Sequence, residues 1–234
     1  MKLSNIVELI EQRIPKDLAL ENDFIGLMDN YDLNQDIKDV YIIMDIYPKD
    51  IPNFDENDLI ITHHKPLFTP EIPTYVLHSN WDIIEGGANE ALAEKLGLEA
   101  IDVFDKDLGI GRICSCNQTF EELSERIIKE FPFSQIVGRP ENIDRVAVVS
   151  GFGLKNPDYI RLASENRIDV LISGDLTQET GVLANNLGVC LINLGHHFSE
   201  VPGLHKLKKT LLELGIHAEV MDNGAPWKQL NISP

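Results

Sequence analysis

The sequence predicts an α/β fold, because apolar, β-branched runs of strand length alternate with amphipathic helical segments along the chain. Clear examples are the runs VYIIMDIY and DLIITHH, which are followed by the helical segment GGANEALAEKLGL. Such alternation is typical of domains in which helices pack on the faces of a sheet in three layers. With 234 residues, the chain is long enough for one large domain or two smaller ones.

The periodicity of apolar residues places the expected elements in order. Apolar side chains recur at helical spacing from Leu3 to Ile14, and Pro15 ends that helix. Thr119 and Glu122 form the pattern of a capping box, which predicts a helix start at this point. Helices are predicted over 3–14, from near 87–89 to 97, and over 119–131, 157–166, 177–187 and 203–214. Strands are predicted over 40–47, 58–64, 145–153, 169–175, 189–197 and 217–221, with a surface connection over 102–109.

Charge and composition disfavour some classes of partner. The formal net charge is −18, from 38 acidic and 20 basic residues, and such a surface repels nucleic acid. A nucleic-acid partner is therefore disfavoured, and the short basic run KLKK (206–209) is interpreted as a solvated helix face. Since no apolar run reaches the roughly 18–20 residues of a membrane helix, we expect no membrane partner. The amphipathic N-terminal segment does not resemble a signal peptide, so we expect a cytoplasmic protein.

The three cysteines, Cys114, Cys116 and Cys190, fit a reducing compartment and do not form a disulfide framework. Cys114 and Cys116 alternate with Ile113 and Ser115, which predicts that both thiols lie on one face of a strand. A metal-binding C-x-C motif is the alternative, but the sequence has no second cysteine pair to complete such a site.

Four of the seven histidines form two adjacent pairs, and each pair follows a predicted apolar strand. The pairs lie in ITHHKPLF (61–68) and in GHHFSE (195–200). A buried strand sends successive side chains to opposite faces, so two adjacent buried imidazoles would be awkward within it. At the exit of a strand both rings can turn into a cleft, where open α/β sheets bind their ligands.

Carboxylates accompany these histidines. His78 precedes Asp82 by four residues, and His196 precedes Glu200 by four. Pro202 disfavours a regular helix through the preceding residue, so we expect the second histidine pair in a strand-to-helix loop. Imidazole and carboxylate together are a ligand set for zinc, iron or manganese. The alternative is that these histidines are ordinary surface or core residues, and their spacing alone leaves both interpretations open.

Four segments carry recognisable motifs. They are ITHHKPLF (61–68), HSNWDIIEGGANEALAEKLGL (78–98), SGDLTQE (173–179) and GHHFSEVPGLHKL (195–207). They resemble, in this order, the HHP, H-T-x-L-D-x-x-x-G-G-x-N, G-[DE]-x-x-x-H and G-H-x-x-[ST]-E-x-x-G motifs of the GTP cyclohydrolase 1 type 2 homologue family. This family is also called the NIF-three-like proteins. The similarity runs from about residue 20 to residue 210, which is nearly the whole chain.

The resemblance implies a set of site residues. Carried over by position, the family's metal ligands fall on His63, His64, Asp82, His196 and Glu200. A further family histidine beside the site falls on His78, so His78 and Glu179 are our candidates for catalytic proton transfer. The implied cofactor is two divalent metal ions per chain, which could be zinc, iron or manganese.

The resemblance also implies an architecture of two α/β domains with mixed sheets flanked by helices. In this arrangement a metal-binding domain comprises residues 1–105 plus 176–234, and a middle domain comprises residues 106–175. The family resemblance further implies a ring-shaped homohexamer with its metal sites facing an internal cavity.

Several positions depart from the family pattern. Lys65 is inserted before the proline of the HHP motif, and NDFIGL (22–27) lacks the tryptophan of W-D-N-V-G-L. Glu179 replaces the histidine of the G-[DE]-x-x-x-H element, and SGFG (150–153) replaces G-G-S-G. These changes flank the predicted ligands without removing them, so they bear on the identity of the substrate.

Three functions are consistent with these residues. The first is a dinuclear metal-dependent hydrolase of a small molecule, a nucleotide or related heterocycle, with GTP as the substrate that the family name implies. The second is a hexameric scaffold that binds nucleic acid or protein and uses its metals structurally. The third is a metal buffer with the same ligands and no turnover.

Overall fold

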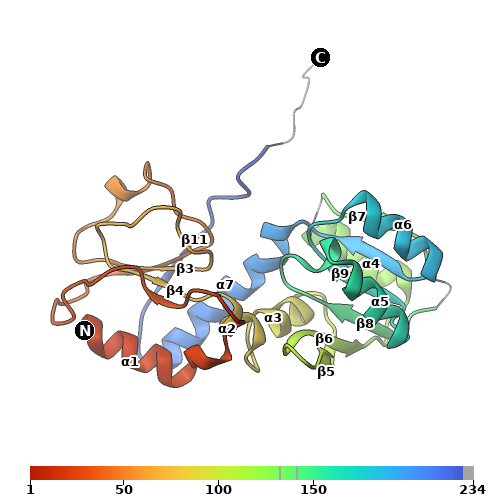
Figure 1. Ribbon diagram of the computed structural model, residues 1–234, viewed down its shortest axis with the longest axis horizontal. Helices are drawn as coiled ribbons and strands as arrows, with labels where there is room; N and C mark the ends of the chain where they lie inside the picture. The colour runs from red at the N-terminus through yellow and green to blue at the C-terminus, as the bar shows by residue number, and fades with distance from the viewer. Residues whose placement is uncertain (132, 141, 229–234) are drawn as a thin grey trace, which may run out of the picture.

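Two mixed β-sheets with helices on their faces form the framework of the molecule (Figure 1). The computed structural model describes residues 1–131, 133–140 and 142–228. The predicted α/β class, with two mixed and helix-flanked sheets, is confirmed. Within this described part, every helix is too short or too polar to cross a bilayer.

The first sheet combines segments from both ends of the chain, in the order β1-β4-β3-β2-β11. Its strands are β1 (Gly26–Leu27), β2 (Val40–Ile43), β3 (Leu59–Thr62), β4 (Thr74–Val76) and β11 (Glu219–Met221). All neighbours are parallel except β1, which is antiparallel to β4. Every residue of β3 is buried, as expected for a parallel strand that is covered on both faces.

The second sheet has the order β5-β6-β8-β9-β10-β7. Its strands are β5 (Glu99–Asp105), β6 (Ile110–Ser115), β7 (Gln135–Val137), β8 (Arg145–Val148), β9 (Val170–Ser173) and β10 (Cys190–Asn193). Strands β8, β9 and β10 are parallel, and the remaining pairs are antiparallel. Alternate residues of these strands face two apolar cores, because successive side chains point to opposite faces.

Seven α-helices and three short 3-10 helices are described. The α-helices are α1 (Leu3–Arg13), α2 (Ser79–Ile83), α3 (Ala88–Lys95), α4 (Phe120–Glu130), α5 (Pro157–Glu165), α6 (Gln178–Leu187) and α7 (His196–Glu213). The 3-10 helices are η1 (Lys16–Leu18), η2 (Ile51–Asn53) and η3 (Gly153–Lys155). Helices α2, α3 and α7 lie between the two sheets, and α3 packs against α7 (Figure 1).

Local sequence signals located several helix ends correctly. The capping box predicted at Thr119 and Glu122 is present in both directions, and α4 begins at the next residue. Helix α3 ends before Gly97, whose φ of +69° is the left-handed conformation that favours glycine after a helix. Cys114 and Cys116 are buried in one apolar cluster, which agrees with the prediction that both thiols lie on one face. Both are free thiols.

The expectation of a loop around the second histidine pair is wrong. Helix α7 begins at His196 and continues through Pro202 to Glu213. A proline inside a helix removes one backbone hydrogen bond, but tertiary packing can outweigh this loss. Here Ser199, Glu200, Gly203 and Leu204 are all buried along the same helix.

The second sheet extends further along the chain than the predicted middle domain of 106–175. Strand β5 lies before residue 106, and β10 lies after residue 175. Strand β5 lacks an apolar alternation, since it is an edge strand whose first four residues are exposed, and the sequence therefore suggested a surface connection there. Residues 229–234 of the predicted first domain lie outside the described residues.

Candidate metal centre

The first histidine pair extends directly from strand β3. The backbone N–H of His63 donates to the carbonyl of Ile43 at 2.9 Å, and that of His64 donates to the carbonyl of Met44 at 3.0 Å. The two imidazoles are therefore fixed at the carboxyl end of a buried parallel strand, where α/β proteins commonly bind ligands. His63 is buried and His64 is half-buried.

Helix α7 contributes a histidine and a carboxylate to the same region. His196 is the first residue of the helix and Glu200 lies one turn later, so the two side chains share a helical face. The Nε2 atom of His196 is 3.1 Å from Oε1 of Glu200. Glu200 is only 3% exposed, so its carboxylate is buried within the cluster.

The short helix α2 contributes the second carboxylate. Asp82 lies in its last turn, and its backbone carbonyl accepts a hydrogen bond from Nδ2 of Asn89 at 2.7 Å. Asn89 also accepts a hydrogen bond from the backbone N–H of Ser150, at the end of β8. The buried side chain of Asn89 therefore links the backbone of Asp82 to the loop that follows β8.

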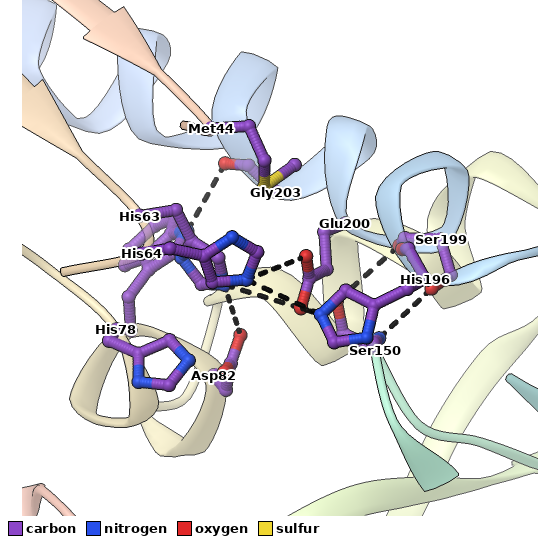
Figure 2. Close-up of polar contacts among 12 residues, drawn as sticks. Met44, His63, His64, His78, Asp82, Ser150, His196, Ser199, Glu200 and Gly203 are labelled. Atoms are coloured by element: carbon purple, nitrogen blue, oxygen red, sulfur yellow. Dashed lines mark hydrogen bonds and ion pairs between the residues drawn. The ribbon is translucent and has the colours of Figure 1, made fainter. Parts of the chain in front are cut away.

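The predicted ligands converge around one carboxylate (Figure 2). Oε1 of Glu200 is 3.5 Å from Nε2 of His63, and Oε2 is 3.3 Å from Nε2 of His64. The Nε2 atoms of His64 and His196 are 3.3 Å apart. Oδ1 of Asp82 is 3.9 Å from Nε2 of His63. All five predicted ligands thus direct a donor atom into one small volume.

The other nitrogen of each ring is held by a fixed acceptor. Nδ1 of His64 lies 2.9 Å from Oδ1 of Asp45, and Nδ1 of His196 lies 2.9 Å from Oδ2 of Asp175. Nδ1 of His63 lies 3.1 Å from the carbonyl of Leu77. Carboxylate and carbonyl oxygens only accept, so Nδ1 carries the proton in each ring. When such a ring is neutral, Nε2 carries a free electron pair that is directed at the centre, as in metal-ligating histidines.

Several buried polar atoms of the cluster lack a hydrogen-bond partner among the described residues. They are Nε2 of His63, Oδ1 of Asp82 and Oε2 of Glu200. Buried polar atoms without a partner are costly, so three of them in one place indicate a missing ligand. Donor atoms around an ion at about 2.1 Å would be about 3.4 Å apart in a tetrahedral arrangement, close to the observed spacing. The donor set therefore fits a divalent cation.

The electrostatics of the metal-free cluster point the same way. Burial alone would lower the pKa of His64, but its contacts with the carboxylates of Asp45 and Glu200 outweigh burial and raise that pKa to about 10. For His196, the contacts with Glu200 and Asp175 similarly outweigh burial and raise the pKa to about 9. Burial acts to raise the pKa of Glu200, but the surrounding imidazoles hold it well below its usual range. Without a metal, protonated histidines supply the positive charge that this carboxylate needs.

Asp82 behaves differently from Glu200. Burial raises the pKa of Asp82 above its ordinary value, because its contact with His63 compensates only in part. Its half-buried carboxylate therefore lacks a sufficient countercharge in the metal-free protein. A cation between Asp82 and His63 would provide that charge.

His78 lies at the edge of the cluster. Its ring centroid is 5.0 Å from that of His63 and 5.5 Å from that of His64. Its Nδ1 is 2.9 Å from both carboxylate oxygens of Asp23, and this contact outweighs burial and lowers the pKa of Asp23. The Nδ1–H of His78 therefore donates to the carboxylate of Asp23, and Nε2 of His78 remains available for proton exchange.

Glu179 does not join the site. Its side chain is exposed in the first turn of α6, and Asp175 reaches His196 instead. Asp175 has a φ of +62°, a left-handed conformation that is uncommon for a residue with a side chain. This segment therefore contributes its aspartate to the centre and leaves the predicted catalytic glutamate outside it.

Two glycines allow the backbone to approach the cluster closely. A Cβ atom on Gly151 would lie 2.3 Å from Oε1 of Glu200, and one on Gly174 would lie 2.5 Å from the backbone nitrogen of His196. Gly151 also donates its N–H to Oγ of Ser199 at 2.9 Å, and that hydroxyl donates to the carbonyl of His196. The loop after β8 is thus packed directly onto the first turn of α7.

A cavity of about 300 Å³ opens beside the cluster. Its walls combine groups of the centre with apolar side chains from both halves of the chain. They include His78, Asp82, His196 and Glu200, and also Leu20, Ile110 and Phe152. This volume is at the small end of the range for ligand sites, so it suits a small molecule or one ring system.

The fold and the donor set define a class: α/β proteins with two sheets and a buried histidine–carboxylate cluster that could hold divalent metal. Within that class, the chain belongs to the Duf34/NIF3 (NGG1p interacting factor 3) family, whose profile matches residues 1–74 and 67–223. The resemblance inferred from the sequence motifs is confirmed.

Relatives match over almost their full length. A protein of Methanothermobacter thermautotrophicus named GTP cyclohydrolase 1 type 2 homolog is 39% identical over 230 residues, covering 98% of this chain and 96% of its own. The structure of reduced HcgD from Methanocaldococcus jannaschii is 32% identical with a TM-score of 0.81, covering 94% of this chain and 97% of its own. A Bacillus cereus protein related to NIF3 is 18% identical and shares the fold, with a TM-score of 0.84 over 98% and 99% of the two chains.

Proposed function

We propose that this protein binds two divalent metal ions and hydrolyses a nucleotide or a related heterocycle. The observation that carries the proposal is the position of Glu200, whose two oxygens face different histidines at the centre of the cluster. A carboxylate with this placement could take part in binding both cations. His64, His196 and Glu200, whose donor atoms lie within 4.8 Å of one another, would hold one ion. His63, which contacts both Asp82 and Glu200, would hold the other together with Asp82.

The two ions, when bound, would supply Lewis acidity that lowers the pKa of water toward neutrality and polarises the group under attack. The chain itself would supply proton transfer through His78. Asp23 holds Nδ1 of this ring, so Nε2 can take a proton on one side of the reaction and return it on the other. His78 and Asp82 both line the cavity, which supports a role for this imidazole beside a bound substrate.

The cavity supports a substrate with a small planar reacting group. Leu20, Ile110 and Phe152 form apolar walls, while Asn89 and Ser150 add polar groups. An apolar slot with a few fixed polar groups suits a heterocyclic ring better than an extended chain. The names of the curated relatives, GTP cyclohydrolase 1 type 2 homolog, agree with a nucleotide as the source of that ring.

The metal content of the purified protein is the first test. We expect close to two equivalents of zinc, iron or manganese per chain by mass spectrometry, on tag-free protein prepared without chelators. His63→Ala and Glu200→Ala should each lower this content, because each removes a donor from the cluster. His217→Ala is the matched control, since His217 is exposed and lies outside the centre. Full metal content in both donor variants would overturn the proposal.

Turnover is the second test, using a panel of nucleotides with the metal-loaded protein. His78→Gln should lower the rate while leaving metal content intact, because His78 is proposed to move protons and not to bind the ions. Equal rates for His78→Gln and the unmodified protein would remove His78 from the mechanism.

The alternative function is a scaffold in which the metals are structural. One lysine of the basic run, Lys206, is already paired with Glu94 at 2.7 Å, which weakens the case for nucleic-acid binding. A gel-shift assay at low salt distinguishes the two functions, since the hydrolase proposal expects no shift. The ring-shaped homohexamer and the cytoplasmic location remain predictions from the sequence.

A further inference from the structure

Helix α2 is only five residues long, yet it carries one of the two carboxylates of the centre. A helix this short is not stable by itself, so its position is set by tertiary contacts. Its C-terminal carbonyls have no continuing helical turn to accept from, and they lie directly after Asp82. Whatever satisfies these carbonyls also fixes the end of the helix from which Asp82 projects.

The carbonyl of Ile84 also accepts from the backbone N–H of Gly87 at 3.0 Å, but the side chain that reaches both carbonyls comes from the second sheet. Arg112 of β6 is 5% exposed, and its Nη2 donates to the carbonyls of Ile83 at 2.7 Å and Ile84 at 3.4 Å. Its Nη1 donates to the carbonyls of Gly109 at 3.1 Å and Gly111 at 2.8 Å. One guanidinium therefore clamps the turn between β5 and β6 onto the end of α2.

The charge of Arg112 is balanced locally. Its Nε donates to the carboxylate of Glu90, in the first turn of α3, so the buried cation has a partner. The guanidinium also lies at the negative end of the α2 dipole, where a cation is favourable. Of this ion pair, Glu90 therefore neutralises the charge, and Arg112 makes the contacts with the end of α2.

We infer that Arg112 is a positioning residue: by holding the last carbonyls of α2, it fixes the direction in which Asp82 presents its carboxylate to the metal centre. This inference rests on the proposed metal binding. The candidate site is built mainly on the first sheet and α7. The inference gives a residue of the second sheet a role in that site. Outer contacts of this kind typically change metal affinity by about 10- to 100-fold.

The test compares two variants with the unmodified protein. Arg112→Met leaves Glu90 buried without a partner and could fail to fold, so it is combined with Glu90→Gln to remove both charges. Glu90→Gln alone is the matched control, because it abolishes the ion pair and keeps the arginine on the carbonyls of α2. The readout is the affinity for Zn²⁺, measured by competition with a chromophoric chelator. We expect a loss of at least about tenfold for the combined variant and little change for the control.

A double-mutant cycle with Asp82→Ala separates positioning from general destabilisation. If Arg112 acts through Asp82, adding the combined variant to Asp82→Ala should cost no further affinity. A further tenfold loss in that background, or equal Zn²⁺ affinity in the combined variant and the Glu90→Gln control, would overturn the inference.

A second readout does not depend on metal. Trp81 lies on α2 and is 1% exposed, and the only other tryptophan of the chain, Trp227, is exposed. In a Trp227→Phe background, the combined variant should shift the emission of Trp81 to longer wavelength and increase its quenching by acrylamide. The Glu90→Gln control should not. Absence of zinc, iron and manganese binding by the unmodified protein would refute the proposed function, whereas an unchanged Trp81 signal would refute the role of Arg112.

Discussion

A histidine ligand depends on the group that fixes its other nitrogen. In this centre two histidines, His64 and His196, are held by the carboxylates of Asp45 and Asp175, whereas His63 is held by the carbonyl of Leu77. A carboxylate makes the imidazole more basic than a carbonyl does. The pair His64 and His196 should therefore be stronger donors than His63.

Replacing one of these carboxylates tests this point at the scale of a single residue. In Asp175→Asn the amide can accept from Nδ1 of His196 or donate to it, so the ring is no longer held in one tautomer. We expect a loss of metal affinity of about 10- to 100-fold, with little change in fold. Zn²⁺ affinity measured by chelator competition checks this prediction.

The matched control is Asp158→Asn. Asp158 is an exposed aspartate that pairs only with Arg161 among the described residues, so its loss should leave metal affinity unchanged. Equal affinities for Asp175→Asn and Asp158→Asn would show that the carboxylate beside His196 plays no part in metal binding.

The sequence located the side chains that converge in the cluster better than the residues that support them. The histidines were found because two adjacent pairs at strand ends are unusual and match family motifs. Asp23 and Asp175 lie in segments compared with family motifs, but the motifs did not show which histidines they contact, and Asp45 lies in none of the motifs. Their role follows from the contacts that the fold creates over 19 to 55 positions of sequence.

At the scale of elements, the centre depends on how closely the loop after β8 approaches helix α7. Gly151 has a φ of +81°, and a Cβ atom there would meet Glu200 at 2.3 Å. The sequence showed a glycine-rich turn at this place, but did not show that it packs onto the first turn of α7. The packing was not predicted because Pro202 favours a loop by its local propensity, whereas tertiary packing stabilises a helix at this place.

Gly151→Ala tests this approach. The alanine should disturb Glu200 and destabilise the protein by at least about 1 kcal/mol, since it adds a clash to left-handed backbone strain. We expect metal content to fall together with thermal stability. Gly188→Ala is the control, because Gly188 has a φ of +71° at the end of α6 with open space around it in the described structure. Gly188→Ala should lower stability and keep the metal, and metal retention in Gly151→Ala would contradict the prediction.

At the scale of the whole molecule, the centre joins parts that are far apart in the sequence. Strand β3 and helix α2 come from the first half of the chain, α7 comes from its end, and the loop after β8 belongs to the second sheet. Charge in the centre is therefore coupled to the association of these parts. The protonation state of its histidines should then influence the stability of the entire fold.

The pH dependence of unfolding follows from the raised pKa values of His64 and His196, about 10 and about 9. In the unfolded chain both values return to about 6.5, so the metal-free protein gains stability from these protons below that pH. It loses this contribution as the pH rises through about 9 to 10, by up to about 1.4 kcal/mol per pH unit for each proton. Metal binding needs neutral imidazoles and releases the same protons, so it becomes stronger over this range. The difference in melting temperature between Zn²⁺-loaded and metal-free protein should therefore grow from pH 6.5 to pH 9 in calorimetry. A difference that stays constant or shrinks would show that these histidines are not protonated in the metal-free fold.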